Sequence, residues 1–213
     1  MSTSKNLSWL LHFLAPAASA ALLLLSGCAP LHETYYEPSS EGLLAHRQDC
    51  HAQIGPPREI DIGVGNSRIA LWIERGVYLD LSFSVAIAVD SDGQSSRHGK
   101  YRAASSILAI SPSEFTAYAI SPVQPLRIKP GILRRINRGN AEGQPLPSKV
   151  ELKAISPSIQ ENIWYVMHFD VELNGAREFS VVVPPFTVDG ITVPSRTINF
   201  IEKSTWYISP LNC

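Results

Sequence analysis

The segment from Val77 to Val89 has an apolar residue at every odd-numbered position. Its even-numbered positions include Tyr78, Asp80, Ser82 and Ser84. A period of two over thirteen residues predicts a β-strand with one buried face. We therefore expect Asp80 on the face that points to solvent.

The apolar residues just before this segment also fall at odd positions, so a hairpin joining the two must place odd residues opposite odd residues. A three-residue loop over 74–76 does this by pairing Ile73 with Val77. The same register sets Trp72 opposite Tyr78 on the other face. That aromatic pair either packs beneath another element or contacts a partner.

A second alternating segment runs from Ile163 to Leu173, and 177–183 follows with its own apolar residues at odd positions. Pairing the two with matched faces requires a loop of three or five residues around 174–176, although the Asn-Gly dipeptide there suggests two. We follow the face pattern, which sets Glu172 opposite Glu178 on the solvent face.

Shorter segments complete an all-β pattern. The further strands are expected at 101–110, 115–120, 150–155, 186–188 returning through Asp189-Gly190 to Ile191, 197–201 and 205–208. Four Ile-Ser-Pro tripeptides and Pro184-Pro185 are interpreted as strand ends, because proline cannot donate to a strand ladder. Short strands, frequent turns and many prolines predict an antiparallel β-sandwich, immunoglobulin- or transthyretin-like in general architecture.

Residues 28–66 lack a sustained period and contain Pro30, Pro38, Pro56 and Pro57. They are predicted to form a tether and an irregular lead-in, with a short helix over 41–53 as an option. The sandwich domain is then expected to span 67–213.

Composition excludes two broad classes of protein. The chain has 213 residues, of which 45% are hydrophobic and 17% charged, with a formal net charge of -1. It is too apolar to be disordered. It also lacks the basic excess of a dedicated nucleic-acid binder, so no nucleic-acid partner is expected.

Residues 1–27 have the layout of a secretory signal, with Lys5 followed by an apolar stretch and small residues. The apolar stretch is short and interrupted by His12 and Pro16, which disfavours a retained transmembrane helix. Its end, Leu25-Ser26-Gly27-Cys28, resembles the lipobox of bacterial prolipoproteins in all four positions.

The prolipoprotein resemblance implies cleavage before Cys28, lipid on its sulfur and acylation of the new amino group. Several acyl chains on one residue give stable membrane anchoring. Ala29 in the next position implies the outer membrane, facing the periplasm. The mature chain would have 186 residues and a net charge of -2.

Cys50 and Cys213 are then the remaining cysteines, and an exported compartment is oxidising. We predict one structural disulfide between them, with two independent thiols as the alternative. No Cys-x-x-Cys motif suggests redox activity.

The search for a catalytic, metal or cofactor motif is negative. The nearest approach to a metal cluster is His46, Asp49, Cys50 and His51. A disulfide at Cys50 would leave three possible ligands, whereas a zinc site needs three or four that converge. Asp90-Ser91-Asp92-Gly93 resembles the opening of a calcium loop but lacks the later acidic ligand. His168 lies on the outer face of its strand and is interpreted as a surface residue. We therefore predict no catalytic residue, metal or cofactor.

One charged segment stands out between residues 97 and 138, where Glu114 is the only acidic residue. It carries eight of the seventeen basic residues of the mature chain: Arg97, Lys100, Arg102, Arg127, Lys129, Arg134, Arg135 and Arg138. Pro130-Gly131 is interpreted as a turn within it. Such a segment would suit an anionic lipid, an envelope polymer or an acidic protein. The alternative is an edge strand protected by its charges.

These observations leave three functional classes. The one favoured by the missing catalytic set is an envelope lipoprotein that acts as a non-catalytic binding or scaffold module. The second is an immunity or inhibitor lipoprotein against an envelope-acting toxin or hydrolase. The third is an enzyme whose site is assembled from distant residues.

Overall fold

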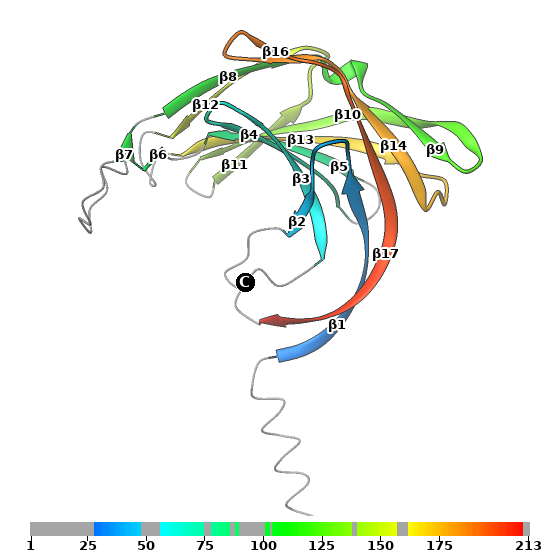
Figure 1. Ribbon diagram of the computed structural model, residues 1–213. Helices are drawn as coiled ribbons and strands as arrows, with labels where there is room; N and C mark the ends of the chain where they lie inside the picture. The colour runs from blue at the N-terminus through cyan, green and yellow to red at the C-terminus, as the bar shows by residue number, and fades with distance from the viewer. Residues whose placement is uncertain are drawn as a thin grey trace, which may run out of the picture.

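The computed structural model describes residues 28–47, 56–74, 78–85, 88–89, 101–102, 104–137, 140–156 and 162–210. These residues form an all-β, antiparallel structure (Figure 1). Its strands are β1 (Cys28–Ser39), β2 (Ala45–Arg47), β3 (Pro57–Val64), β4 (Ser67–Glu74), β5 (Tyr78–Val85), β6 (Ala88–Val89), β7 (Tyr101–Arg102), β8 (Ala104–Ile110), β9 (Thr116–Ile120), β10 (Val123–Asn137), β11 (Asn140–Pro145), β12 (Val150–Ser156), β13 (Ile163–Glu172), β14 (Glu178–Val183), β15 (Phe186–Val188), β16 (Ile191–Val193) and β17 (Arg196–Pro210). One short 3-10 helix, Pro112–Glu114, precedes β9.

Most of the strands belong to one large open sheet, in which β13 is a branch point. The main path runs β1-β17-β14-β9-β10-β13-β12-β8-β15-β16. Along one edge β13 pairs with β10, and along the other it pairs with β5 and, at Ile163, with β12. From β13, a side branch of four strands in the order β5-β4-β3-β2 extends the sheet away from the main path. Figure 1 shows the sheet arching over, with β1 and β17 descending from one side.

The inner face of this sheet holds one continuous apolar core. Leu79, Leu81 and Phe83 of β5 are fully buried, as are Met167 and Phe169 of β13. All five are odd-numbered residues from the two alternating segments. The period-two prediction of a buried odd face is therefore confirmed for both strands.

Several shorter strands also lie where the pattern predicts them, namely β8, β9, β12, β15 and β16. The β15-β16 hairpin turns through Asp189 and Gly190, whose φ angles are 51° and 80°. Aspartate and glycine tolerate this left-handed conformation better than other residues, which explains the turn. The predicted strand 77–89 is shorter than expected, because β5 ends at Val85 and β6 pairs with β7.

In the β4-β5 hairpin, odd-numbered residues pair with odd-numbered residues as predicted, but the register differs. Glu74 pairs with Tyr78, Ile73 with Leu79, and Trp72 with Asp80. The expected pairs of Ile73 with Val77 and Trp72 with Tyr78 are therefore wrong by two residues. A two-residue shift keeps the same face buried, so the apolar pattern does not distinguish the two registers.

The predicted hairpin between the strands at 163–173 and 177–183 does not form. Asn174 and Gly175 have φ angles of 51° and 80°, and the Ala176 amide donates to the Leu173 carbonyl at 2.9 Å. The Asn-Gly dipeptide thus makes the tight two-residue turn that we set aside. After the turn, β14 pairs with β9 and β17 and not with β13. The apolar faces of β13 and β14 therefore do not need to be aligned across the turn.

The N-terminal tether and lead-in, predicted to be irregular, contain paired strands. The strand β1 pairs with β17 along its whole length, from Cys28 opposite Pro210 to Ser39 opposite Asn199. The predicted helix over 41–53 is replaced, in its described part, by a turn and β2. The predicted strands 197–201 and 205–208 are one continuous β17. This ribbon joins segments from opposite ends of the chain, so local periodicity could not reveal it.

The dipeptide Pro130-Gly131 is not a turn. It lies within β10, where the register with β13 shifts between Pro130 and Ile132. A proline without an amide hydrogen fits at such a bulge. A Cβ added to Gly131 would lie 3.1 Å from the backbone oxygen of His168, so the neighbouring strand approaches closely here.

We predict that Gly131→Ala lowers the free energy of unfolding by about 1 kcal/mol, because the His168 carbonyl must move away from the new methyl group. Gly143→Ala on β11 is the matched control. Its Cβ would meet only the Ile132 side chain, at 3.4 Å. Urea denaturation of both variants measures the difference, and equal stability would contradict the close approach.

Candidate functional site

The even-numbered face of β5 carries a buried charged cluster. In the sheet register, Trp72, Asp80, His168 and Ile132 form one row across β4, β5, β13 and β10. The Asp80 side chain is 1% exposed and that of His168 is 16% exposed. The expectations that Asp80 points to solvent and that His168 is a surface residue are therefore wrong, because their strands bury both faces here.

The Asp80 and His168 side chains share a hydrogen bond between Oδ1 and Nδ1. Burial raises the pKa of Asp80 from 3.8 to about 8, the hydrogen bond and negative charge of Glu74 add to this, and the Arg134 charge opposes it. Burial and the Arg134 charge lower the pKa of His168 below 6.5, against the charge of Glu74. Near pH 7 these shifts favour the neutral form of each side chain, and the tautomer of His168 decides which of the two donates in their hydrogen bond.

In a Ser-His-Asp triad, the aspartate orients the histidine that acts as general base for a nucleophile, so an Asp-His pair supplies two of the three members. The neighbours of His168 on this face are Asp80 and Ile132 across the sheet and Val166 and Asp170 along its strand. None of these four offers a hydroxyl or thiol nucleophile, but the Ser82 hydroxyl lies on the same face, opposite Val166. His168 Nε2 is itself buried, with no hydrogen-bond partner among the described residues. The geometry therefore fits a buried pair of ionisable side chains better than the active site of a hydrolase.

A second polar cluster joins β2, β3 and β4. His46, Glu59 and Asp61 place three potential metal-ligand atoms within 4.8 Å of one another. His46 Nε2 lies 2.9 Å from an Asp61 oxygen. Arg68 donates to both carboxylates, at 2.7 Å to Asp61 and through Nη2 to Glu59. A guanidinium already supplies the positive charge that a metal ion would bring, so the geometry favours a salt-bridge network.

This cluster differs from the group considered in the sequence. His46 meets carboxylates of β3, whereas Asp49, Cys50 and His51 lie outside the described residues. Sequence reasoning missed Glu59 and Asp61 because it did not predict β3. The expected calcium-like loop, Asp90-Ser91-Asp92-Gly93, also lies outside the described residues.

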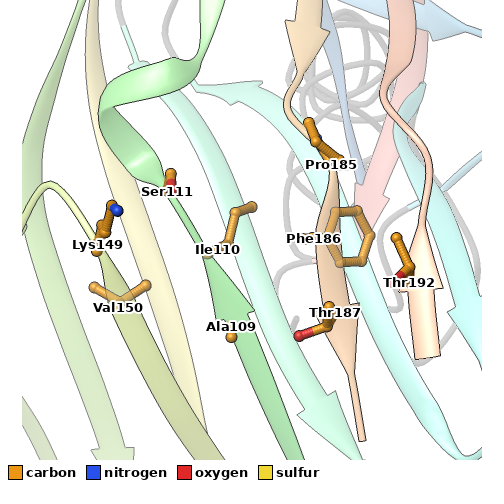
Figure 2. Close-up of a pocket in the computed structure, with 9 residues that line it drawn as sticks. All are labelled: Ala109, Ile110, Ser111, Lys149, Val150, Pro185, Phe186, Thr187 and Thr192. Carbon is orange, nitrogen blue, oxygen red and sulfur yellow. The ribbon is translucent and has the colours of Figure 1, made fainter. Parts of the chain in front are cut away.

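A small pocket opens where two strands of the sheet diverge. β8 and β15 pair at Ala109 with Thr187 and at Leu108 with Val188. Beyond these pairs lies a pocket of about 290 Å³, shown in Figure 2 with Lys149 at one side. Its buried lining includes Ile110 and Phe186, both part of the apolar core. The volume is at the lower limit of small-molecule sites.

The basic segment is partly neutralised by its neighbour. Arg127 and Lys129 of β10 lie 3.4 and 3.6 Å from the Glu172 carboxylate on β13. Arg134 and Arg135 are consecutive in a strand and so project from opposite faces. Four of the eight predicted residues thus lie along β10. The register shift at Gly131 leaves Arg127, Lys129 and Arg134 on one face, opposite even-numbered residues of β13, and Arg135 on the other. Of the others, Arg97, Lys100 and Arg138 lie outside the described residues, and Arg102 belongs to β7.

The exposed aromatic residues are also distributed differently from expectation. Tyr78 is 41% exposed and Trp72 is half-buried, and they lie two residues apart in the register, because Trp72 pairs with Asp80. Trp206 is 70% exposed on the β1-β17 ribbon, with its ring centroid 4.9 Å from that of His32. Sequence analysis missed this pair because it did not predict β1.

The structure describes one of the three cysteines. Cys28 is the first residue of β1, while Cys50 and Cys213 lie outside the described residues. No helix in the described part of the chain is long and apolar enough to cross a membrane. No protein-family model and no curated protein sequence matches this chain.

We predict that Asp80→Asn removes a pH dependence of stability. The raised pKa of Asp80 favours the folded state below pH 4, and this contribution is lost as the pH rises from 4 through about 8. The variant does not ionise, so it should gain about 4 kcal/mol over the wild type between pH 5 and pH 9. Urea denaturation at both pH values measures this. Asp170→Asn, exposed on β13, is the control, and parallel curves for Asp80→Asn and wild type would refute the assignment.

We also predict that Arg68→Gln lowers the free energy of unfolding by about 2 kcal/mol, because it removes the cation beside the buried Glu59 carboxylate. Arg127→Gln should change it by less than about 0.5 kcal/mol, since its ion pair with Glu172 is exposed. Chemical denaturation at neutral pH compares the two. Equal losses would show that the β3-β4 network contributes no more than a surface ion pair.

Proposed function

We propose that this protein is a membrane-anchored lipoprotein of the bacterial envelope that acts as a non-catalytic binding or scaffold module. The observation that carries the proposal is the sequence Leu25-Ser26-Gly27-Cys28, whose cysteine is the first residue of β1. Residues 1–27 are the signal peptide, and Cys28 carries the acyl chains. The anchor faces the periplasm from the outer membrane.

The domain that follows is, on this proposal, a β-sandwich of immunoglobulin- or transthyretin-like architecture. Three features of the described residues support it: antiparallel pairing, one apolar core, and a link between β4 and β8, which do not pair with each other. This link is the hydrogen bond from Ser67 to Ser106, 2.6 Å long and buried. Opposed inner faces of two layers would bring such residues together.

A binding role is supported by the character of the polar clusters. The Asp80-His168 pair is buried, with no described hydroxyl hydrogen-bonded to His168 Nε2, and the His46 cluster is already occupied by Arg68. The partner we propose is another protein or an anionic polymer of the envelope, with no cofactor. The titrating Asp80-His168 pair is the one observation that favours the alternative of an enzyme.

The anchor is tested with Cys28→Ala. Wild-type cells should incorporate radiolabelled palmitate into this protein and retain it in the membrane fraction. The variant should incorporate none and leave the outer-membrane fraction, because the sulfur that receives the lipid is gone. Immunoprecipitation and membrane fractionation measure both effects. Labelling that survives the substitution would contradict the proposal. Cross-linking in intact envelopes is a second test: if the wild type and Cys28→Ala cross-link to the same partners, the proposal is also contradicted.

A further inference from the structure

We propose that a polar pocket beside the start of β17 binds a carboxylate group of a ligand, with Arg196 as its counter-ion. The pocket has a volume of about 560 Å³. Six of the residues that line it are polar: Ser40, Glu41, Ser195, Arg196, Thr197 and Asn199. The inference names a ligand chemistry for the proposed binding role and rests on that role, but its test does not depend on the lipid anchor.

The pocket exists because β1 ends opposite Asn199, three residues from the first residue of β17, Arg196. The pairing of these strands stops at Ser39 opposite Asn199, while β14 continues along the other edge of β17 to Arg196. Ser40 then turns away, and its hydroxyl donates to the Thr197 carbonyl at 2.8 Å. Residues 196–198 therefore have no strand partner on the β1 side among the described residues, and the space beside them is open.

Arg196 is the charged group of this space. Its Nε atom is buried and has no hydrogen-bond partner in the described part of the chain. Its Nη1 reaches the Glu41 backbone oxygen at a long 3.4 Å. No described carboxylate makes an ion pair with it, whereas Arg58 and Arg177 each have one. A buried donor without a partner is costly, and an acceptor supplied by a ligand would offset that cost.

The residues around Arg196 add further donors. Ser180 donates to Asn199 Oδ1 at 2.6 Å, which fixes the amide and leaves its Nδ2 hydrogens without a partner among the described residues. The Ser195 hydroxyl is committed to the Val183 carbonyl at 2.8 Å and holds the turn before β17. A guanidinium matches the two oxygens of a carboxylate, and the Asn199 amide is a further donor that lines the same pocket.

The Glu41 side chain selects among anions. It is exposed and lines the same pocket, so its charge repels a doubly charged phosphate more than a singly charged carboxylate. A ligand with a single free carboxylate, such as the C-terminus of a short peptide, therefore suits this pocket.

The test is a titration of the ¹⁵N-labelled protein with N-acetyl-trialanine, followed through the Arg196 Nε-Hε resonance. Arg196→Gln assigns this resonance by its disappearance. The carboxylate form should give a saturable shift, and the C-terminal amide of the same peptide should bind at least about tenfold more weakly. Backbone resonances of 196–199 should shift with the carboxylate form in the wild type and stay unchanged in Arg196→Gln.

Arg177→Gln is the matched control, because it removes the same charge from an exposed side chain and should leave binding intact. Equal responses to acid and amide, a shift that does not saturate, or backbone shifts that persist in Arg196→Gln would each overturn the proposal. Tighter binding of inorganic phosphate than of the peptide would overturn the choice of carboxylate. The palmitate result has no bearing on any of these outcomes, so the two proposals fail separately.

Discussion

The burial of the odd face of β13 is the constraint on which the rest of the structure depends. Met167 and Phe169 are fully buried, and their strand is paired on both edges, with β10 on one side and β5 on the other. Because successive side chains alternate, this burial forces His168 to the opposite face. The same parity in β5 sends Asp80 there too. The core and the buried polar pair are therefore two results of a single alternation.

The two polar clusters show different ways of keeping carboxylates out of water. Burial and the nearby Glu74 carboxylate raise the pKa of Asp80 to about 8, which favours its protonated form near pH 7. Glu59 and Asp61 instead have a cation beside them, because Arg68 donates to both. The two clusters lie on the same side of adjoining strands.

The sequence was most informative where the structure is local. The periods of β5 and β13 and the Asp189-Gly190 turn were predictable from neighbouring residues. The β4-β5 register was not, since a slip of two residues leaves the apolar face unchanged. The strand β1 and the pocket at Arg196 were also out of reach, because each depends on pairing between segments more than 150 residues apart. Asp80 was misplaced because alternation gives the face of a residue and not what covers that face.

The β1-β17 ribbon has a mechanical consequence if Cys28 holds the lipid. Free chain would not intervene between the membrane and the ribbon, because β1 begins at Cys28 itself. Twelve residues of strand reach about 40 Å, a fixed standoff that a flexible linker would not maintain. A pull on Cys28 along the strand axis would load the hydrogen bonds to β17 together, in shear, and not one after another. The domain would then meet its partners as a rigid projection from the bilayer, at one height.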